Sequence, residues 1–162
     1  HSRIMAYDGP VSEPGPIAPL AGVESAIEGA IDTTDAPEKL VLGVPAYGRN
    51  WPTFVTGECP AELVEGRTSV TALTVDDLVA LRGATPTFVP ETGEWTFEYD
   101  LALDDGVTSC VQTRRVHYIA GDGIRARMDL AREHQLGGVS LWALGFDDQG
   151  VWDAILPTVT PP

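Results

Sequence analysis

The fold is decided by the sequence GGVSLWALG at residues 137–145. Its central apolar run is bounded by glycines and is too short for a helix, so it predicts a strand buried on both faces of a sheet. Directly before it, residues 122–135 predict a helix, because Ile124, Met128 and Ala131 recur at helical spacing. A helix that leads into a buried strand is typical of a parallel sheet.

Trp142 lies near the carboxyl end of this strand. In α/β proteins that end of the sheet is where ligands bind. Most buried tryptophans only fill the core, however. The strand alone therefore leaves two interpretations of Trp142, a floor for a ligand or a core residue.

The first fifty residues repeat the same pattern. Residues 3–8 (RIMAYD) predict a short strand, and the Pro/Gly-rich segment 9–19 cannot be a helix or a central strand. A helix begins at Leu20, with its apolar residues on one face, and residues 39–46 predict a second buried strand. Alternating strands and helices predict an α/β fold with a parallel sheet.

Residues 51–119 interrupt this alternation. A short helix is predicted up to Arg82 with Thr74 as its N-cap. A hairpin is predicted around Thr92-Gly93, because aromatic and polar residues alternate in its second arm, and residues 107–119 supply a further strand. The interruption is therefore predicted to be a small inserted α+β subdomain.

The charge of the chain narrows the range of partners. Its 162 residues carry 24 acidic against 10 basic side chains, a net charge of −14, which opposes binding to nucleic acid or to an anionic membrane. No apolar run approaches the roughly 18 residues that a membrane helix needs. The three histidines, His1, His117 and His134, are not spaced as metal ligands, so no metal is predicted. No cofactor is predicted either.

Cys59 and Cys110 are the two cysteines of the chain. Both lie in polar, irregular surroundings, which favours a disulfide and hence a secreted protein. Two free buried thiols are the alternative. A bridge closing so long a loop is worth about 4 kcal/mol in the chain-entropy model.

Three stretches together resemble glycoside hydrolase family 18: MAYD at residues 5–8, LGVPAYGR at 42–49 and GGVSLWALG at 137–145. They are similar to the sixth, seventh and eighth strands of that family, and the spore-cortex-lytic and chitinase-like subgroup is the most similar part of it. The resemblance implies the C-terminal part of a (β/α)8 TIM barrel with an inserted α+β subdomain.

The domain organisation follows from this match. Residues 1–50 would hold barrel strands six and seven with the intervening helix, and residues 51–119 the inserted subdomain. Residues 120–162 would hold a barrel helix, strand eight, and a C-terminal helix and tail.

The resemblance also implies a function. The family hydrolyses polymers of β-linked N-acetylglucosamine, such as chitin or peptidoglycan, by a retaining mechanism in which the substrate's own acetamido group attacks. Tyr7 and Asp8 match the residues that position the acetamido group and the sugar, and Trp142 matches the aromatic floor. Met5 is expected to form a wall of the pocket. Tyr47 and Arg49 either line the cleft or serve packing and a surface ion pair.

The acidic motif of the family's fourth strand, which ends in the general acid, has no counterpart in this sequence. The segment alone is therefore expected to be inactive, as part of a secreted or cell-wall-associated hydrolase. A lectin-like sugar-binding module of the same fold is the alternative. Bare strand edges predict self-association or contact with the missing N-terminal half.

Overall fold

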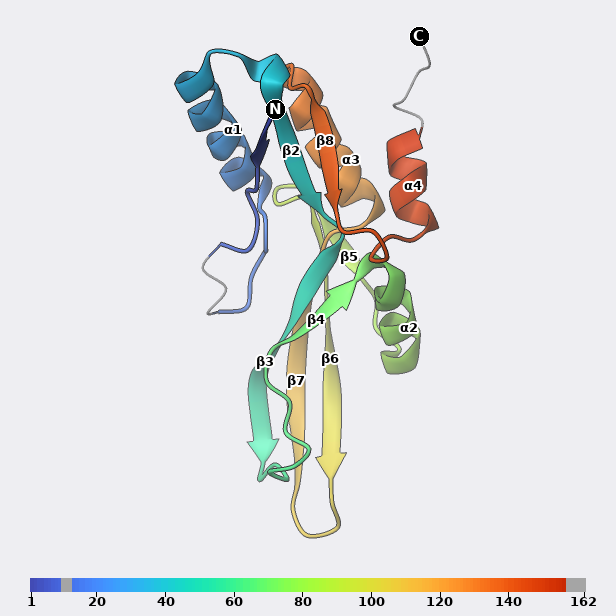
Figure 1. The fold of residues 1–162 in the computed structure, drawn as a ribbon. Helices are drawn as coiled ribbons and strands as arrows, with labels where there is room; N and C mark the ends of the chain where they lie inside the picture. The colour runs from blue at the N-terminus through green and yellow to red at the C-terminus, as the bar shows by residue number, and fades with distance from the viewer. Residues whose placement is uncertain (10–12, 157–162) are drawn as a thin grey trace.

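The computed structural model describes residues 1–9 and 13–156. Part of the Pro/Gly-rich connection (10–12) and the predicted C-terminal tail (157–162) lie outside the described residues. The molecule contains a three-stranded parallel sheet and a five-stranded antiparallel sheet, and the antiparallel sheet extends from the parallel one as a long arm (Figure 1).

The parallel sheet consists of β1 (Ser2–Ile4), β2 (Leu40–Pro45) and β8 (Gly138–Trp142). Its strand order is β1-β2-β8, and both pairs are parallel, which confirms the predicted parallel sheet. The first strand is shorter than expected: it ends at Ile4, because the chain leaves the sheet before Asp8. The eighth strand ends at Trp142.

Helices connect the parallel strands, as predicted. The helix α1 (Leu20–Thr34) follows β1, the 3-10 turn η1 (Pro37–Lys39) precedes β2, and α3 (Gly121–Glu133) leads into β8 (Figure 1). A last helix, α4 (Gln149–Ile155), packs against α3. The core between helices and sheet includes Ile4, Ile27, Leu42, Val44 and Ile124.

The opposite face of the parallel sheet is partly open among the described residues: it is covered at Gly43 and Pro45 of β2 but accessible along β8. Side chains alternate along β2, so the face away from the helical core carries Val41, Gly43 and Pro45. Trp142, paired with Pro45, is 51% exposed. The prediction of a strand buried on both faces is therefore wrong for β8, none of whose residues is fully buried, because the helices cover one face only. It is confirmed for β2, in which all residues but Val41 are buried.

The antiparallel sheet has the order β4-β3-β7-β6-β5. Its strands are β3 (Tyr47–Gly57), β4 (Thr68–Thr71), β5 (Thr87–Val89), β6 (Glu94–Asp104) and β7 (Ser109–Tyr118). It starts at Tyr47, so residues 47–50 continue directly from the parallel sheet into the arm.

The predicted helix of the inserted subdomain is α2 (Ala72–Arg82). It starts earlier than expected: Thr71, not Thr74, is its N-cap, and Thr74 completes a capping box from the third helical position. The helix packs on a second apolar cluster that includes Val75, Phe97 and Val116. The alternating aromatic side chains predicted for the second hairpin arm thus point into this cluster.

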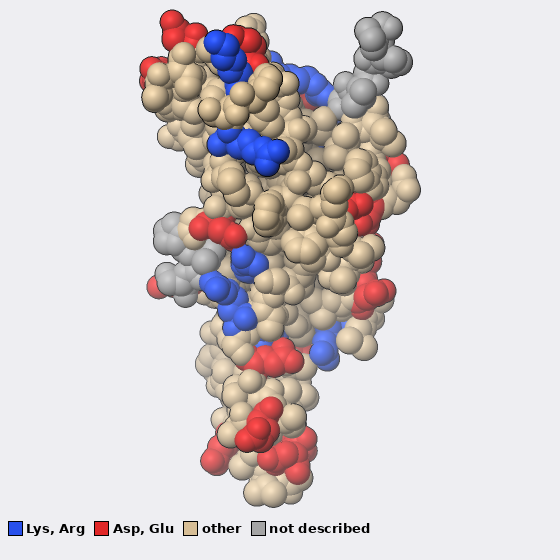
Figure 2. Space-filling view, in the orientation of Figure 1, with Lys and Arg blue, Asp and Glu red and all other residues tan. Residues whose placement is uncertain are grey.

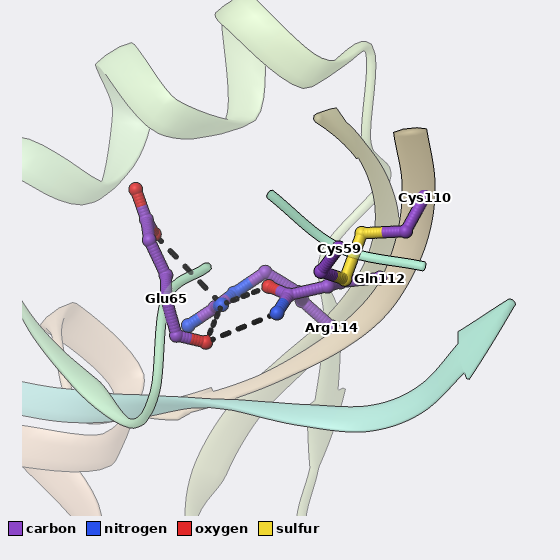
Figure 3. The surroundings of a disulfide bond; sticks show 5 residues. All are labelled: Cys59, Glu65, Cys110, Gln112 and Arg114. Atoms are coloured by element: carbon purple, nitrogen blue, oxygen red, sulfur yellow. Dashed lines mark hydrogen bonds and ion pairs between the residues drawn. A yellow bond between two sulfur atoms is a disulfide. The ribbon is translucent and has the colours of Figure 1, made fainter. Parts of the chain in front are cut away.

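The segment between β3 and β4 is held by side chains and not by regular structure. Cys59 and Cys110 form a disulfide with a Cα–Cα distance of 4.7 Å (Figure 3). Arg114, fully buried, donates to the side chains of Asn50 and Gln112 and to the backbone carbonyl of Glu65. The guanidinium thus replaces the backbone ladder that this irregular segment lacks.

Among the described residues, no helix is both long enough and apolar enough to cross a bilayer. No three of their histidine, cysteine or acidic side chains are grouped so that they would hold a metal ion.

Candidate functional site

A cleft of about 240 Å³ lies where β2 and β8 end and β3 begins. Its lining includes Asp8, Tyr47, Arg49, Ser69, Trp142 and Phe146. The structure therefore brings together four of the six sugar-site residues predicted from the sequence. The other two, Met5 and Tyr7, line a neighbouring hollow of about 520 Å³ beside β1, and the Met5 side chain is exposed.

The Asp8 carboxylate is the centre of the cleft's polar network. The Tyr47 hydroxyl donates to Oδ2 at 2.5 Å, and the Arg49 guanidinium donates to Oδ1 at 2.9 Å. Because two donors on different oxygens hold the carboxylate, its orientation is fixed. Asp8 remains partly exposed, so the pair with Arg49 is worth no more than about 1 kcal/mol in stability.

Arg49 is itself held from two further sides. Its guanidinium lies over the Tyr47 ring, 4.9 Å from the centroid, and Nη1 donates to the Ser69 hydroxyl at 2.6 Å. Tyr47 also contacts Tyr7 and Phe146 edge-on, with centroid distances of 6.3 and 6.2 Å. The two β3 residues that enter the cleft, Tyr47 and Arg49, thus hold the Asp8 carboxylate from both of its oxygens.

Burial raises the pKa of Tyr47 above its ordinary value, and the hydrogen bond to Asp8 and the charge of that carboxylate raise it further. The pKa of Tyr7 is also raised, first by burial and then by Asp8. Both phenols therefore stay protonated at neutral pH. Each can act as a hydrogen-bond donor, but neither can act as a base.

The backbone around Asp8 explains how its side chain reaches the cleft. Asp8 has a φ of 54°, in the left-handed region that aspartate tolerates better than most residues. Its amide donates to the Ile17 carbonyl at 3.0 Å, which closes the loop after β1. The turn thus places Asp8 outside the sheet and beside the loop that ends at Ile17.

A glycine creates the space for Tyr7. A Cβ built on Gly43 would lie 3.1 Å from the Tyr7 ring and 3.1 Å from the Ile4 carbonyl oxygen. The ring therefore lies against the bare backbone of β2, and any larger residue at position 43 would displace it.

Trp142 connects the parallel sheet to the start of the arm. Its carbonyl accepts from the Ala46 amide at 2.8 Å, and the peptide bond to Ala143 is cis. About half of the residue's surface is accessible, so the indole presents apolar area to the cleft. Such a surface suits the C–H face of a sugar ring.

One functional feature was missed by sequence reasoning: a buried ion pair between Glu94 and Arg127, 3.6 Å apart. Glu94 accepts from the Ile17 and Ala18 amides at 3.1 and 2.7 Å. Ile17 is also the residue whose carbonyl holds the Asp8 amide. The first residue of β6 thus fixes the loop that carries Asp8.

Arg127 completes this junction. It donates to the carbonyls of Gly93 and Gly123, each at 2.8 Å, and to that of Ala18. Burial lowers the pKa of Arg127 to about 10 and raises that of Glu94, and their mutual attraction opposes both shifts. A cation among the apolar positions of the helix was the available signal in the sequence, since Ile124 and Met128 flank it on the same buried face.

The comparisons with known proteins agree with this architecture. The family model "Glycosyl hydrolases family 18" matches residues 1–147. The chain belongs to glycosyl hydrolase family 18. Members of this family are glycosidases. The α/β fold of this chain is similar to that of solved family 18 chitinases.

Two curated relatives illustrate the range of the family. The "Uncharacterized glycosylase YvbX" of Bacillus subtilis is 27% identical over 94% of this chain and 40% of its own length. The "Probable chitinase 2" of Drosophila melanogaster is 28% identical over 90% of this chain and 31% of its own length. The chain therefore spans less than half of each relative.

Solved structures give the same proportion. A chitinase from Chromobacterium violaceum matches with a TM-score of 0.77 and 26% identity over 99% of this chain and 45% of that one. The spore cortex-lytic enzyme SleL of Bacillus megaterium matches with a TM-score of 0.75 and 22% identity over 98% of this chain and 33% of that one. The second likeness concerns the fold alone.

Proposed function

We propose that this chain is the C-terminal part of a glycosidase that cleaves polymers containing β-linked N-acetylglucosamine. In this proposal β1, β2 and β8 are strands six, seven and eight of a (β/α)8 barrel. The observation that carries it is the fixed Asp8 carboxylate beside the exposed Trp142 indole, at the carboxyl ends of parallel strands. The names of two relatives, the "Probable chitinase 2" of Drosophila melanogaster and the chitinase of Chromobacterium violaceum, support the substrate class.

Each residue has a role in a substrate-assisted reaction. The acetamido oxygen of the substrate attacks the anomeric carbon, and the bond to the leaving oxygen breaks as a general acid protonates that oxygen. Water then opens the resulting cyclic intermediate with retention. Tyr7 donates to the acetamido oxygen, Asp8 holds the sugar in its attack position, and Trp142 forms the floor.

The general acid comes, in this proposal, from the part of the barrel that this chain does not include. Relatives more than twice as long as the matched region are consistent with that division. Tyr47 and Arg49 act through Asp8: their two hydrogen bonds hold its carboxylate in one orientation. The disulfide between Cys59 and Cys110 supports a secreted or cell-wall-associated location.

The test separates sugar binding from turnover. The chain is titrated with the tetramer of N-acetylglucosamine while hydrolysis is followed. We expect measurable binding without turnover, and we expect Trp142→Ala to weaken binding at least tenfold. Leu144→Ala, two residues away and 81% exposed, is the matched control and leaves binding unchanged.

Two results would contradict the proposal. Equal affinity in Trp142→Ala and Leu144→Ala would remove Trp142 from the site. Sustained turnover, abolished by replacing an acidic residue of this chain, would show that the acid lies within it. Hydrolysis that appears on adding the separately expressed N-terminal half, and disappears with Asp8→Ala, is the positive result; binding with no turnover even then would favour the lectin-like alternative.

A further inference from the structure

A second cleft, of about 480 Å³, lies between α2, the end of the antiparallel sheet, and the N-terminal ends of α3 and α4. It shares no lining residue with the cleft around Asp8. Its lining includes Asp76, Trp95, Tyr118, Asp122, Arg125 and Asp148. Three helices and the antiparallel sheet thus converge on one hollow that the proposed reaction does not use.

The floor of this cleft is aromatic. The rings of Trp95 and Tyr118 are stacked, with centroids 6.5 Å apart and planes 25° from parallel. Phe88 supports Trp95 from β5, with a centroid distance of 5.3 Å. The half-buried Trp95 is therefore held rigidly between two rings, and its accessible part gives the cleft an apolar surface for the C–H groups of a sugar.

The Tyr118 hydroxyl is the second observation that indicates a ligand. Tyr118 is only 5% exposed, it lines the cleft, and its hydroxyl makes no hydrogen bond with any described residue. The hydroxyl oxygen is not one of the fully buried unpaired atoms of the described residues, so it is open to the cleft, where a ligand can pair with it. Burial, followed by the charges of Asp76 and Asp148, raises the pKa of Tyr118 to about 12, so the hydroxyl remains a donor.

The rim of the cleft is strongly negative. Four carboxylates line it, those of Asp76, Asp122, Asp148 and Asp153, against one cation, Arg125. None of the four lies within ion-pair distance of a basic group in the part of the chain that the structure describes. Figure 2 shows acidic side chains gathered along the edge of the molecule where α2 and α4 lie. An aromatic floor under uncompensated carboxylates suits a ligand with an apolar face and an ammonium group.

We propose that this cleft binds a sugar unit that carries a free amino group, such as a glucosamine unit of a partly de-N-acetylated polymer. The sugar ring packs on Trp95, the ammonium group faces Asp76 and Asp148, and Tyr118 donates to a sugar oxygen. The choice of polymer rests on the proposed function, but the cleft itself does not. The site would hold a strand of substrate away from the reacting bond.

The experiment compares two oligosaccharides on the same chain. The glucosamine tetramer and the N-acetylglucosamine tetramer are titrated against Asp76→Asn/Asp148→Asn and against Asp77→Asn/Asp129→Asn. The second variant removes the same charge at exposed positions outside the cleft. Asparagine at 148 keeps an acceptor for the Val151 amide, so α4 stays capped.

We expect the cleft variant to weaken binding of the glucosamine tetramer at least tenfold, the control variant to leave it within twofold, and Trp142→Ala to have no effect on it. Equal weakening by both double variants would reduce the interaction to general attraction by a chain of net charge −14 and overturn the proposal. Equal cleft-dependent binding of the N-acetylated tetramer would overturn ammonium recognition. Tighter cleft-dependent binding of a lysine tetramer would overturn the sugar class. Loss of N-acetylated tetramer binding in Trp142→Ala alone concerns only the first cleft.

Discussion

The antiparallel arm encloses its own apolar core. The parallel sheet, in contrast, is covered by helices on one face only, and its other face is partly open. In the arm, Phe97, Leu101 and Val116 pack with the residues of α2, and a disulfide joins the irregular segment to β7. At the parallel sheet, Trp142 of β8 is 51% exposed, and Met5, directly after β1, is 59% exposed. Its two outer strands pair only with β2 among the described residues.

This difference indicates how stability and function are divided. An arm with its own core, disulfide and buried arginine has the interactions of an independent unit. A parallel sheet with an open apolar face needs a further surface to cover it. The candidate sugar site lies on the incomplete side, at the point where the two regions meet.

The largest expected effect concerns the ion pair at that meeting point. Arg127→Met leaves the Glu94 carboxylate buried without its cation, so we expect a loss of about 3–5 kcal/mol in the free energy of unfolding. Arg125→Met, on the exposed side of the same helix, is the control and should change stability by less than about 0.5 kcal/mol. Urea unfolding measures both variants.

The same variants test the connection to Asp8. Amide hydrogen exchange at Asp8 should accelerate in Arg127→Met, because the loop that supplies the Ile17 carbonyl loses its anchor. Unchanged exchange at Asp8 together with lost stability would mean that the pair holds the two regions together without positioning the carboxylate.

The second prediction concerns the arm alone. Replacing both Cys59 and Cys110 by serine opens a loop of 51 residues, which the chain-entropy model values at about 4 kcal/mol. Hydrogen exchange should accelerate in β3, β6 and β7 and stay the same in β2 and β8. Uniform acceleration in both sheets would show that they unfold as one unit, which would contradict the independence of the arm. In the unmodified chain, thiol titration under denaturing, non-reducing conditions should find no free thiol.

These tests also separate what the sequence predicted from what it did not. Local patterns sufficed for the parallel strands and their helices, because apolar runs and helical spacing follow directly from burial on the core side. The family resemblance was confirmed by the family model. Local patterns failed where burial depends on another part of the protein. Trp142 lies in an apolar run that predicts burial, but its exposure depends on whether another part of the protein covers that face of the sheet.

The buried ion pair between Glu94 and Arg127 shows the opposite case, in which a charged residue is buried by contacts that are distant in the sequence. Glu94 is a polar residue at the start of an alternating strand, and nothing local shows that it is fully buried. Its partners, Ile17 and Arg127, lie 77 and 33 residues away along the chain. The Thr71 cap was missed for a simpler reason, since two threonines three residues apart both suit a helix N-terminus.

The third prediction tests the open face. We expect the isolated chain to self-associate at micromolar concentration through the uncovered side of the parallel sheet. Val41→Lys places a charge on that side without entering the helical core, and it should weaken association at least tenfold in sedimentation experiments. Val55→Lys, exposed on β3 in the arm, is the control. A monomeric wild-type chain, or equal effects of both lysines, would show that the open face is not the contact.

The smallest expected effect is a pH dependence that belongs to the arm. His117 lies on β7 beside Trp51, and burial, assisted by the nearby Arg115, lowers its pKa to about 4, while Glu98 opposes the shift. A histidine with a lowered folded-state pKa is held neutral by the fold, so the unfolded chain binds the proton first as the pH falls. Stability from this source is complete above about pH 6.5 and is lost between pH 6.5 and 4. Because the ring is only partly buried, we expect a loss on the order of 1 kcal/mol and not the full value of the shift.

The measurement is the difference in unfolding free energy between the wild type and His117→Gln from pH 7 to 4, which cancels the titration of the carboxylates. A difference that stays constant across this range would show that the arm does not hold His117 neutral. A difference that falls with pH, accompanied by faster exchange in β3 and β7 but not in β2 and β8, would confine the effect to the arm.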